Sequence, residues 1–185
     1  MRKNFKLERW FISDLFYKGY IAAVTEGPNQ SDIFGIRKSL FAIEFEIKTS
    51  RSDFMNEINL INKILNNEHN SKLFYRMNNK YHKHNSYLGR PSSFAEFDFR
   101  PNEFYFVIPE ELMEIAKKEI NRMSSPYGLI TFGIEKFTDY VGFSYIIRAK
   151  KLHENKISND SLLYILRKAT TECQELRKRL ISRNE

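Results

Sequence analysis

Two carboxylates and a lysine stand close together within residues 31–54, at positions that two adjacent strands would bring side by side. Asp32 follows a loop, and Glu46 and Lys48 close the second of two apolar runs. Divalent metals held by carboxylates offset the negative charge that shields a phosphodiester, and they activate water. This pattern predicts a Mg²⁺-dependent phosphodiesterase site, where Mn²⁺ would substitute. Asp32, Glu46 and the Ile47 carbonyl would bind the metal, and Lys48 would face the nucleophile or the phosphate.

The expected strands place these groups on neighbouring positions of a hairpin. We expect strands over 32–38 and 41–48, joined by a tight turn at 39–40. In the second strand, side chains alternate between two faces, so Glu46 and Lys48 share one face with Glu44. A turn at 39–40 pairs residues whose numbers sum to about 79, which places Asp32 beside Ile47 and about one residue from Glu46 and Lys48.

A second interpretation of the same charges is purely structural. A strand with charges at alternate positions is commonly a solvated sheet face, and a Glu-x-Lys tripeptide is common in proteins. Because Asp32 comes directly after a loop that contains Gly27 and Pro28, the sequence favours a metal site over a solvated face.

The remaining periodicities predict an α/β fold in which helices flank a mixed sheet. We expect a single domain over residues 1–185 with an inserted basic helix and loop segment. We expect Ser52 to be the N-cap of the helix at 53–66. We expect Cys173 to lie in the buried apolar stripe of the helix at 161–181. The helices are expected at 5–18, 53–66, around 71–83, 110–123 and 161–181, and the other strands at 20–24, 104–108, 127–134 and 143–149.

A basic, aromatic-rich segment indicates a polyanionic partner. The chain carries a formal net charge of +7, and residues 71–95 contain no acidic residue. Lysines and arginines neutralise phosphates, and interleaved aromatic rings stack on bases. We therefore expect DNA backbone contacts from this segment, and Ser50 and Arg51 add a phosphate contact at the start of a helix. The expected contacts within the segment are Arg76, Lys80, His82 and Lys83.

The composition limits the setting of the protein. The longest apolar runs, such as 104–109, are too short to cross a bilayer, and the N-terminal residues lack the apolar core of a signal peptide. Cys173 is a lone cysteine, which excludes an internal disulfide. We therefore expect a cytoplasmic protein with no membrane partner.

The pattern resembles the PD-(D/E)xK nuclease superfamily. The family's strand-start Asp matches Asp32, and its Glu-x-Lys matches Glu46 and Lys48, although Ser31 stands where a Pro commonly precedes the Asp. Residues 46–54, EIKTSRSDF, are similar to the small bacterial and phage members related to the MmcB group of DNA-repair proteins. This resemblance implies a restriction-endonuclease-like core and a magnesium-dependent deoxyribonuclease in DNA repair or phage DNA metabolism, with a possible homodimer. It also implies a catalytic role for Glu8 in the first helix, and a solvated helix face is the other interpretation of this residue.

Two other hypotheses remain open. The chain could be a non-catalytic nucleic-acid-binding module on the same fold, which predicts salt-sensitive DNA binding with no metal requirement. It could also be an accessory or protein-interaction factor that has only inherited the fold.

Overall fold

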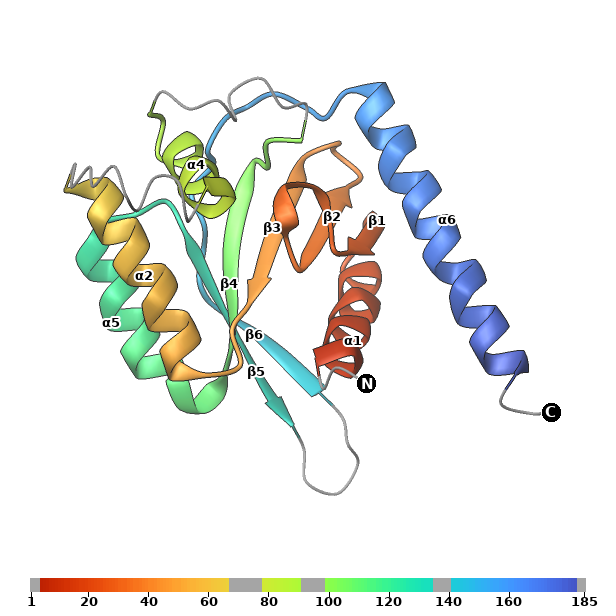
Figure 1. Ribbon diagram of the computed structural model, residues 1–185, viewed down its shortest axis with the longest axis horizontal. Helices are drawn as coiled ribbons and strands as arrows, with labels where there is room; N and C mark the ends of the chain where they lie inside the picture. Colours follow the sequence, from red (N-terminus) through yellow and green to blue (C-terminus); the bar gives the residue numbers. More distant parts are fainter. Residues whose placement is uncertain (1–3, 67–77, 91–98, 135–140, 183–185) are drawn as a thin grey trace.

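The described part of the protein is built on one six-stranded mixed sheet with the order β1-β2-β3-β4-β5-β6. The computed structural model describes residues 4–66, 78–90, 99–134 and 141–182. Strands β1 to β3 form an antiparallel meander, β3, β4 and β5 are parallel, and β6 is antiparallel to β5 (Figure 1). The strands are β1 Tyr20–Thr25, β2 Ile33–Arg37, β3 Ala42–Ile47, β4 Glu103–Pro109, β5 Gly128–Ile134 and β6 Val141–Ile147.

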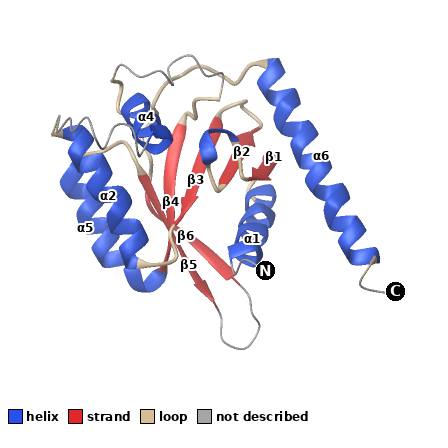
Figure 2. Cartoon of the chain, viewed as in Figure 1, coloured by secondary structure: helices blue, strands red, loops and turns tan. Residues whose placement is uncertain are grey.

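Helices cover both faces of this sheet (Figure 2). Leu7, Phe11 and Leu15 of α1 pack on Phe45 and its neighbours on one face, while the other face carries an apolar cluster that includes residues of α2, α4 and α5. The prediction of an α/β fold with a mixed sheet between helices is confirmed. The helices are α1 Asn4–Tyr17, α2 Arg51–Leu65, α4 Asn78–Tyr87, α5 Met113–Met123 and α6 Asn159–Ile181, with short 3-10 turns at Pro28–Gln30 and Glu110–Leu112.

The side chains of strand β3 point alternately to the two faces of the sheet. Ile43, Phe45 and Ile47 point into the cluster beneath α1, so Glu44 and Glu46 point toward α2 and α4. All six residues of β3 are buried. The charged face of this strand is therefore covered by protein, and the interpretation of it as a solvated sheet face is wrong.

The β2–β3 hairpin differs by one residue from the predicted register. Its paired residues, such as Ile33 with Phe45 and Ile36 with Ala42, have numbers that sum to 78. The loop has three residues rather than two, because Leu40 adopts a left-handed conformation with φ of 64° and donates its N–H to the Arg37 carbonyl. Continuing this register by one residue places Asp32 opposite Glu46, so the two carboxylates share a face.

Some other boundaries also differ from prediction. Helix α2 begins at Arg51, because Ser50 rather than Ser52 is the N-cap and its hydroxyl accepts the Asp53 N–H at 3.2 Å. Helix α4 runs to Tyr87, four residues beyond the expected end, and residues 71–77 of the expected helix lie outside the described residues. The placement of Cys173 in the core is wrong, since its side chain is exposed.

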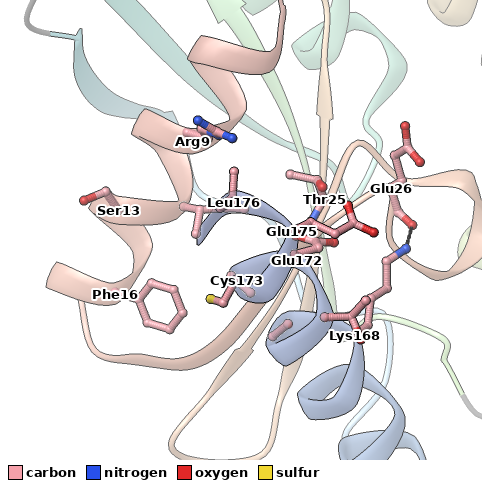
Figure 3. Close-up of a pocket in the computed structure, with 14 residues that line it drawn as sticks. Arg9, Ser13, Phe16, Thr25, Glu26, Lys168, Glu172, Cys173, Glu175 and Leu176 are labelled. Atoms are coloured by element: carbon pink, nitrogen blue, oxygen red, sulfur yellow. Dashed lines mark hydrogen bonds between the residues drawn. The ribbon is translucent and has the colours of Figure 1, made fainter. Parts of the chain in front are cut away.

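Helix α6 lies along the edge strand β1, and its buried Ile165 joins an apolar cluster with Val24 and Phe34 of β1 and β2. Glu172 accepts the Thr25 N–H at 3.2 Å, and Lys168 donates to the Glu26 carbonyl. A groove of about 660 Å³ lies between α1, β1 and α6 (Figure 3). It lies on the α1 side of the sheet, away from Glu46, and the α6 contacts cover an edge that would otherwise offer unpaired backbone groups. No helix within the described ranges is both long and apolar enough to cross a membrane.

Candidate active site

Asp32, Glu46 and Lys48 converge at the point where β2 begins and β3 ends. The Asp32 carboxylate accepts the backbone N–H of Ile47 at 2.7 Å, and the Lys48 ammonium donates to Glu46 at 2.9 Å. Because Lys48 donates its own N–H to Val107 of β4, the N–H and carbonyl of Ile47 point to the β2 side, toward Asp32. The structure thus brings together the three side chains and the backbone group that the sequence selected.

The loop before Asp32 is held in place by its own residues. Gly27 approaches Phe34 and Ser31 so closely that a Cβ would lie 2.5 Å from each side chain. Asn29 adopts φ of 61°, which asparagine tolerates better than most residues, and donates to the Phe99 carbonyl at 2.9 Å. The Ser31 hydroxyl donates to the Pro28 carbonyl at 2.9 Å. These contacts fix the point at which the chain enters β2 and therefore where Asp32 lies.

Glu46 is surrounded by three ammonium groups. One carboxylate oxygen lies 2.9 Å from both Lys48 and Lys80, and the other lies 3.1 Å from Lys83. Burial alone would raise the pKa of Glu46, but the ammonium groups of Lys83, Lys48 and Lys80 outweigh it and lower the pKa to about 2. Glu46 is therefore ionised throughout the physiological pH range.

Glu57 of α2 is a further carboxylate of the site, and the sequence analysis did not select it. It lies 2.7 Å from the Lys48 ammonium and 2.8 Å from that of Lys80, and its other oxygen contacts His84 at 2.9 Å. The second ring nitrogen of His84 lies 2.9 Å from the Tyr127 hydroxyl. Glu57 sits within the apolar stripe of α2, between Phe54 and Ile61, and a charge at a core position of an amphipathic helix was the available signal.

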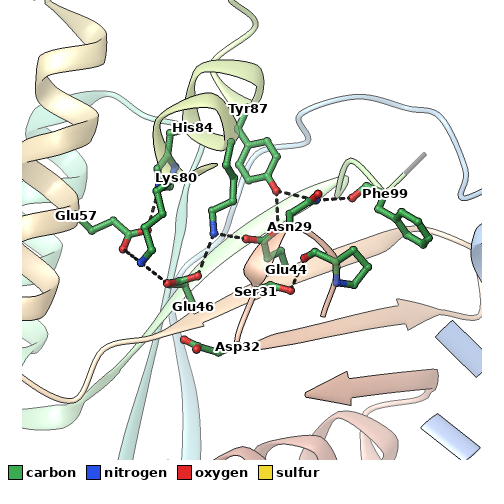
Figure 4. Close-up of polar contacts among 12 residues, drawn as sticks. Asn29, Ser31, Asp32, Glu44, Glu46, Glu57, Lys80, His84, Tyr87 and Phe99 are labelled. Atoms are coloured by element: carbon green, nitrogen blue, oxygen red, sulfur yellow. Dashed lines mark hydrogen bonds and ion pairs between the residues drawn. The ribbon is translucent and has the colours of Figure 1, made fainter. Parts of the chain in front are cut away.

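A second pair of buried groups lies beside Glu46. Lys83 also contacts Glu44 at 2.8 Å, and Tyr87 donates its hydroxyl to Glu44 at 2.5 Å (Figure 4). The side chains of Lys83 and Glu44 are 1% and 0% exposed. Both oxygens of Glu44 are therefore in contact with groups from α4, and the side chain is not open to a ligand.

Asp32 is the acidic group of this cluster that lacks an ammonium partner. Three carboxylates (Glu44, Glu46 and Glu57) face three lysines, whereas Asp32 makes no ion pair with any described residue. Burial and then the charge of Glu46 raise the pKa of Asp32 to about 6. Two carboxylates that face each other with an unbalanced charge attract a cation.

The expected nucleic-acid contacts are only partly available on the surface. Ser50 and Arg51 are exposed at the start of α2, His82 is half-buried, and Arg76 lies outside the described residues. The expectation for Lys83 is wrong, because its ammonium is buried against two carboxylates. Lys80 is 38% exposed but is likewise bound to carboxylates. Within the described part of this segment, Lys80 and Lys83 therefore neutralise carboxylates, while Arg90 donates to the backbone carbonyls of Ile64 and Leu65.

Glu8 lies on α1, whose apolar side packs on the sheet face opposite to Glu46. Its catalytic role remains a prediction.

The residues present fit a hydrated Mg²⁺ rather than a dense metal cage. In the described part of the chain, no group of three or more His, Cys, Asp or Glu side chains is arranged to hold a metal. Mg²⁺ commonly keeps several waters and takes one or two carboxylates from the protein. Asp32, with no ammonium partner among the described residues, and the neighbouring Glu46 could supply those two, and the Ile47 carbonyl points to the same side.

Comparisons with known proteins place the fold but not the activity. No family model and no curated protein matches the chain. A solved structure of the SPO1766 protein of unknown function from Silicibacter pomeroyi resembles it with a TM-score of 0.51 and 12% sequence identity. The similarity covers 95% of this chain and 89% of that one, so the two proteins share the overall fold.

Proposed function

We propose that this protein is a magnesium-dependent deoxyribonuclease of the PD-(D/E)xK type that acts in the cytoplasm. The observation that carries the proposal is the convergence of Asp32, Glu46 and Lys48 at one end of β3, with Asp32 lacking a cationic partner among the described residues. Asp32, Glu46 and the Ile47 carbonyl would hold Mg²⁺. The bound ion would offset the charge of the scissile phosphate and lower the pKa of a water.

Lys48 acts in this proposal as a fixed positive charge rather than as a base. Burial would lower its pKa, but Glu46 and Glu57 outweigh burial and raise the pKa above its ordinary value. An ammonium that stays protonated stabilises a phosphate oxygen or an attacking hydroxide but does not accept a proton. Glu46 and Glu57 hold that ammonium in place at 2.9 and 2.7 Å.

A second function is favoured by one specific observation. Both oxygens of Glu46 already have ammonium partners, as a purely structural ion cluster would. A module of this kind would bind DNA through Ser50, Arg51 and the rest of its basic surface without cutting it. Its affinity would fall steeply with salt and would not depend on a metal.

The test is cleavage of double- and single-stranded DNA by the wild-type protein with Mg²⁺, with Mn²⁺ and with a chelator, beside Lys48→Met. The proposal expects metal-dependent cleavage by the wild type and a loss of at least about a hundredfold in the variant. DNA binding without cleavage in either metal would support the second function instead.

A further inference from the structure

Helix α4 packs on the candidate site through polar side chains that lie on one side of the helix. Lys80, Lys83, His84 and Tyr87 recur at intervals of three, one and three residues, which places them on one side of a helix. Every one of them reaches a carboxylate of β3 or α2: Lys80 reaches Glu46 and Glu57, Lys83 reaches Glu44 and Glu46, His84 reaches Glu57, and Tyr87 reaches Glu44. The helix therefore supplies the positive charge that the carboxylates need when no metal is bound.

The three lysines of the cluster differ sharply in their access to solvent. The side chains of Lys48 and Lys83 are 3% and 1% exposed, whereas that of Lys80 is 38% exposed. A buried ammonium that leaves its carboxylate is stranded in an apolar environment, whereas a partly exposed one can turn into water. Lys80 is therefore the one of these three ammoniums that a soluble cation can displace.

The position of the Lys80 ammonium makes it a competitor for the metal. It bridges Glu46 at 2.9 Å and Glu57 at 2.8 Å (Figure 4). It also binds the same Glu46 oxygen as Lys48. Its charge also acts on Asp32, whose ionised form it favours. The Lys80 ammonium therefore opposes the binding of a cation to Glu46.

We propose that Lys80 is a tethered inhibitor of metal binding, whose ammonium occupies Glu46 until a divalent cation displaces it. This inference rests on the proposed function, because it concerns the same carboxylates. Mg²⁺ must break the ion pair between Lys80 and Glu46 before it can bind Glu46, so its apparent affinity is lower than that of the carboxylates alone.

The test is calorimetric titration of the full chain with MgCl₂ alone, for the wild type, Lys80→Gln and Lys80→Arg. Lys80→Gln removes the competing charge and should bind Mg²⁺ at least about tenfold more tightly than the wild type. Lys80→Arg keeps the charge and should bind as weakly as the wild type. The matched control Lys118→Gln, at an exposed position on α5, should leave the affinity unchanged.

The outcomes separate this inference from the proposed function. Equal Mg²⁺ affinity for the wild type and Lys80→Gln, or equally tight binding by Lys80→Arg and Lys80→Gln, overturns the inhibitory role and leaves the metal site standing. If no variant binds Mg²⁺, both the inference and the metal site of the proposed function are overturned. Lys80→Gln leaves Lys48 and Lys83 in place on Glu46, and circular dichroism checks that it is folded.

Discussion

The Lys48 ammonium and the Glu57 carboxylate lie 2.7 Å apart across the junction between β3 and α2. Lys48 follows the last residue of β3, and Glu57 lies two turns into the helix that comes next. This ion pair ties the strand that carries Glu46 to the helix that follows it. Because both side chains are 3% exposed, the contact is inside the protein, where an unpaired charge is costly.

Glu57→Gln should destabilise the protein by about 3–5 kcal/mol. The substitution removes one partner from buried Lys48 and from Lys80, and breaking a buried ion pair from one side costs about this much. Urea unfolding at pH 7 measures the effect. Glu111→Gln, at an exposed position, is the control and should change stability by less than about 0.5 kcal/mol. A loss in Glu57→Gln as small as the control's would contradict a structural role for this pair.

Lys83→Met should cost a similar amount, about 3–5 kcal/mol, because it leaves buried Glu44 without its ammonium partner and removes one of the partners of Glu46. Adding Glu44→Gln should recover part of the loss, since the side chain that has lost its ammonium partner is then neutral. A double-mutant cycle by chemical denaturation measures this coupling. Purely additive effects of the two substitutions would show that Lys83 and Glu44 do not interact.

Asp32→Asn should make the protein more stable at neutral pH. The folded-state pKa of Asp32 is raised to about 6, from an ordinary value of 3.8, so the folded protein binds more protons than the unfolded chain between these values. The wild type therefore loses stability from Asp32 as the pH rises from about 4 to about 6. Asparagine carries no charge and can still accept the Ile47 N–H.

The difference between the two proteins should appear in unfolding measured at pH 4 and at pH 8. We expect equal stability within error at pH 4 and an advantage of up to about 2 kcal/mol for Asp32→Asn at pH 8. An advantage that is the same at both pH values would show that the effect does not come from the titration of Asp32.

Phe45→Ala should destabilise the fold by about 3–5 kcal/mol without touching the charged cluster. Phe45 is fully buried on the opposite face of β3, with ring centroids 4.9 Å from Phe11 and 5.8 Å from Tyr105. Phe16→Ala is the matched control, because Phe16 is 46% exposed and should lose less than about 1 kcal/mol. Thermal or urea unfolding compares them, and similar losses in both variants would contradict the described core.

Much of the fold could be predicted because local patterns and tertiary packing agree. The alternation in residues 41–48 and the apolar stripe of Phe54, Ile58 and Ile61 predicted β3 and α2, and the apolar side chains of both are buried as expected. The hairpin register was wrong by one residue because nothing in the local sequence marks Leu40, a residue that rarely takes a left-handed conformation, as the end of a three-residue loop.

The candidate site was only half predictable. Asp32, Glu46 and Lys48 lie within one hairpin, so strand geometry was enough to bring them together. Glu57, Lys80 and Lys83 join them only through the packing of α2 and α4, which residue spacing does not reveal. Because of these long-range contacts, lysines that we expected on a DNA-binding surface pair with buried carboxylates instead.

The cleavage activity of Asp32→Asn tests the central claim most directly, because this variant should be at least as stable as the wild type at pH 8. With a DNA substrate and Mg²⁺, the account predicts a fall of at least about a hundredfold in the cleavage rate together with an unchanged or higher melting temperature. A cleavage rate within twofold of a metal-dependent wild type would contradict the assignment of Asp32 to the metal.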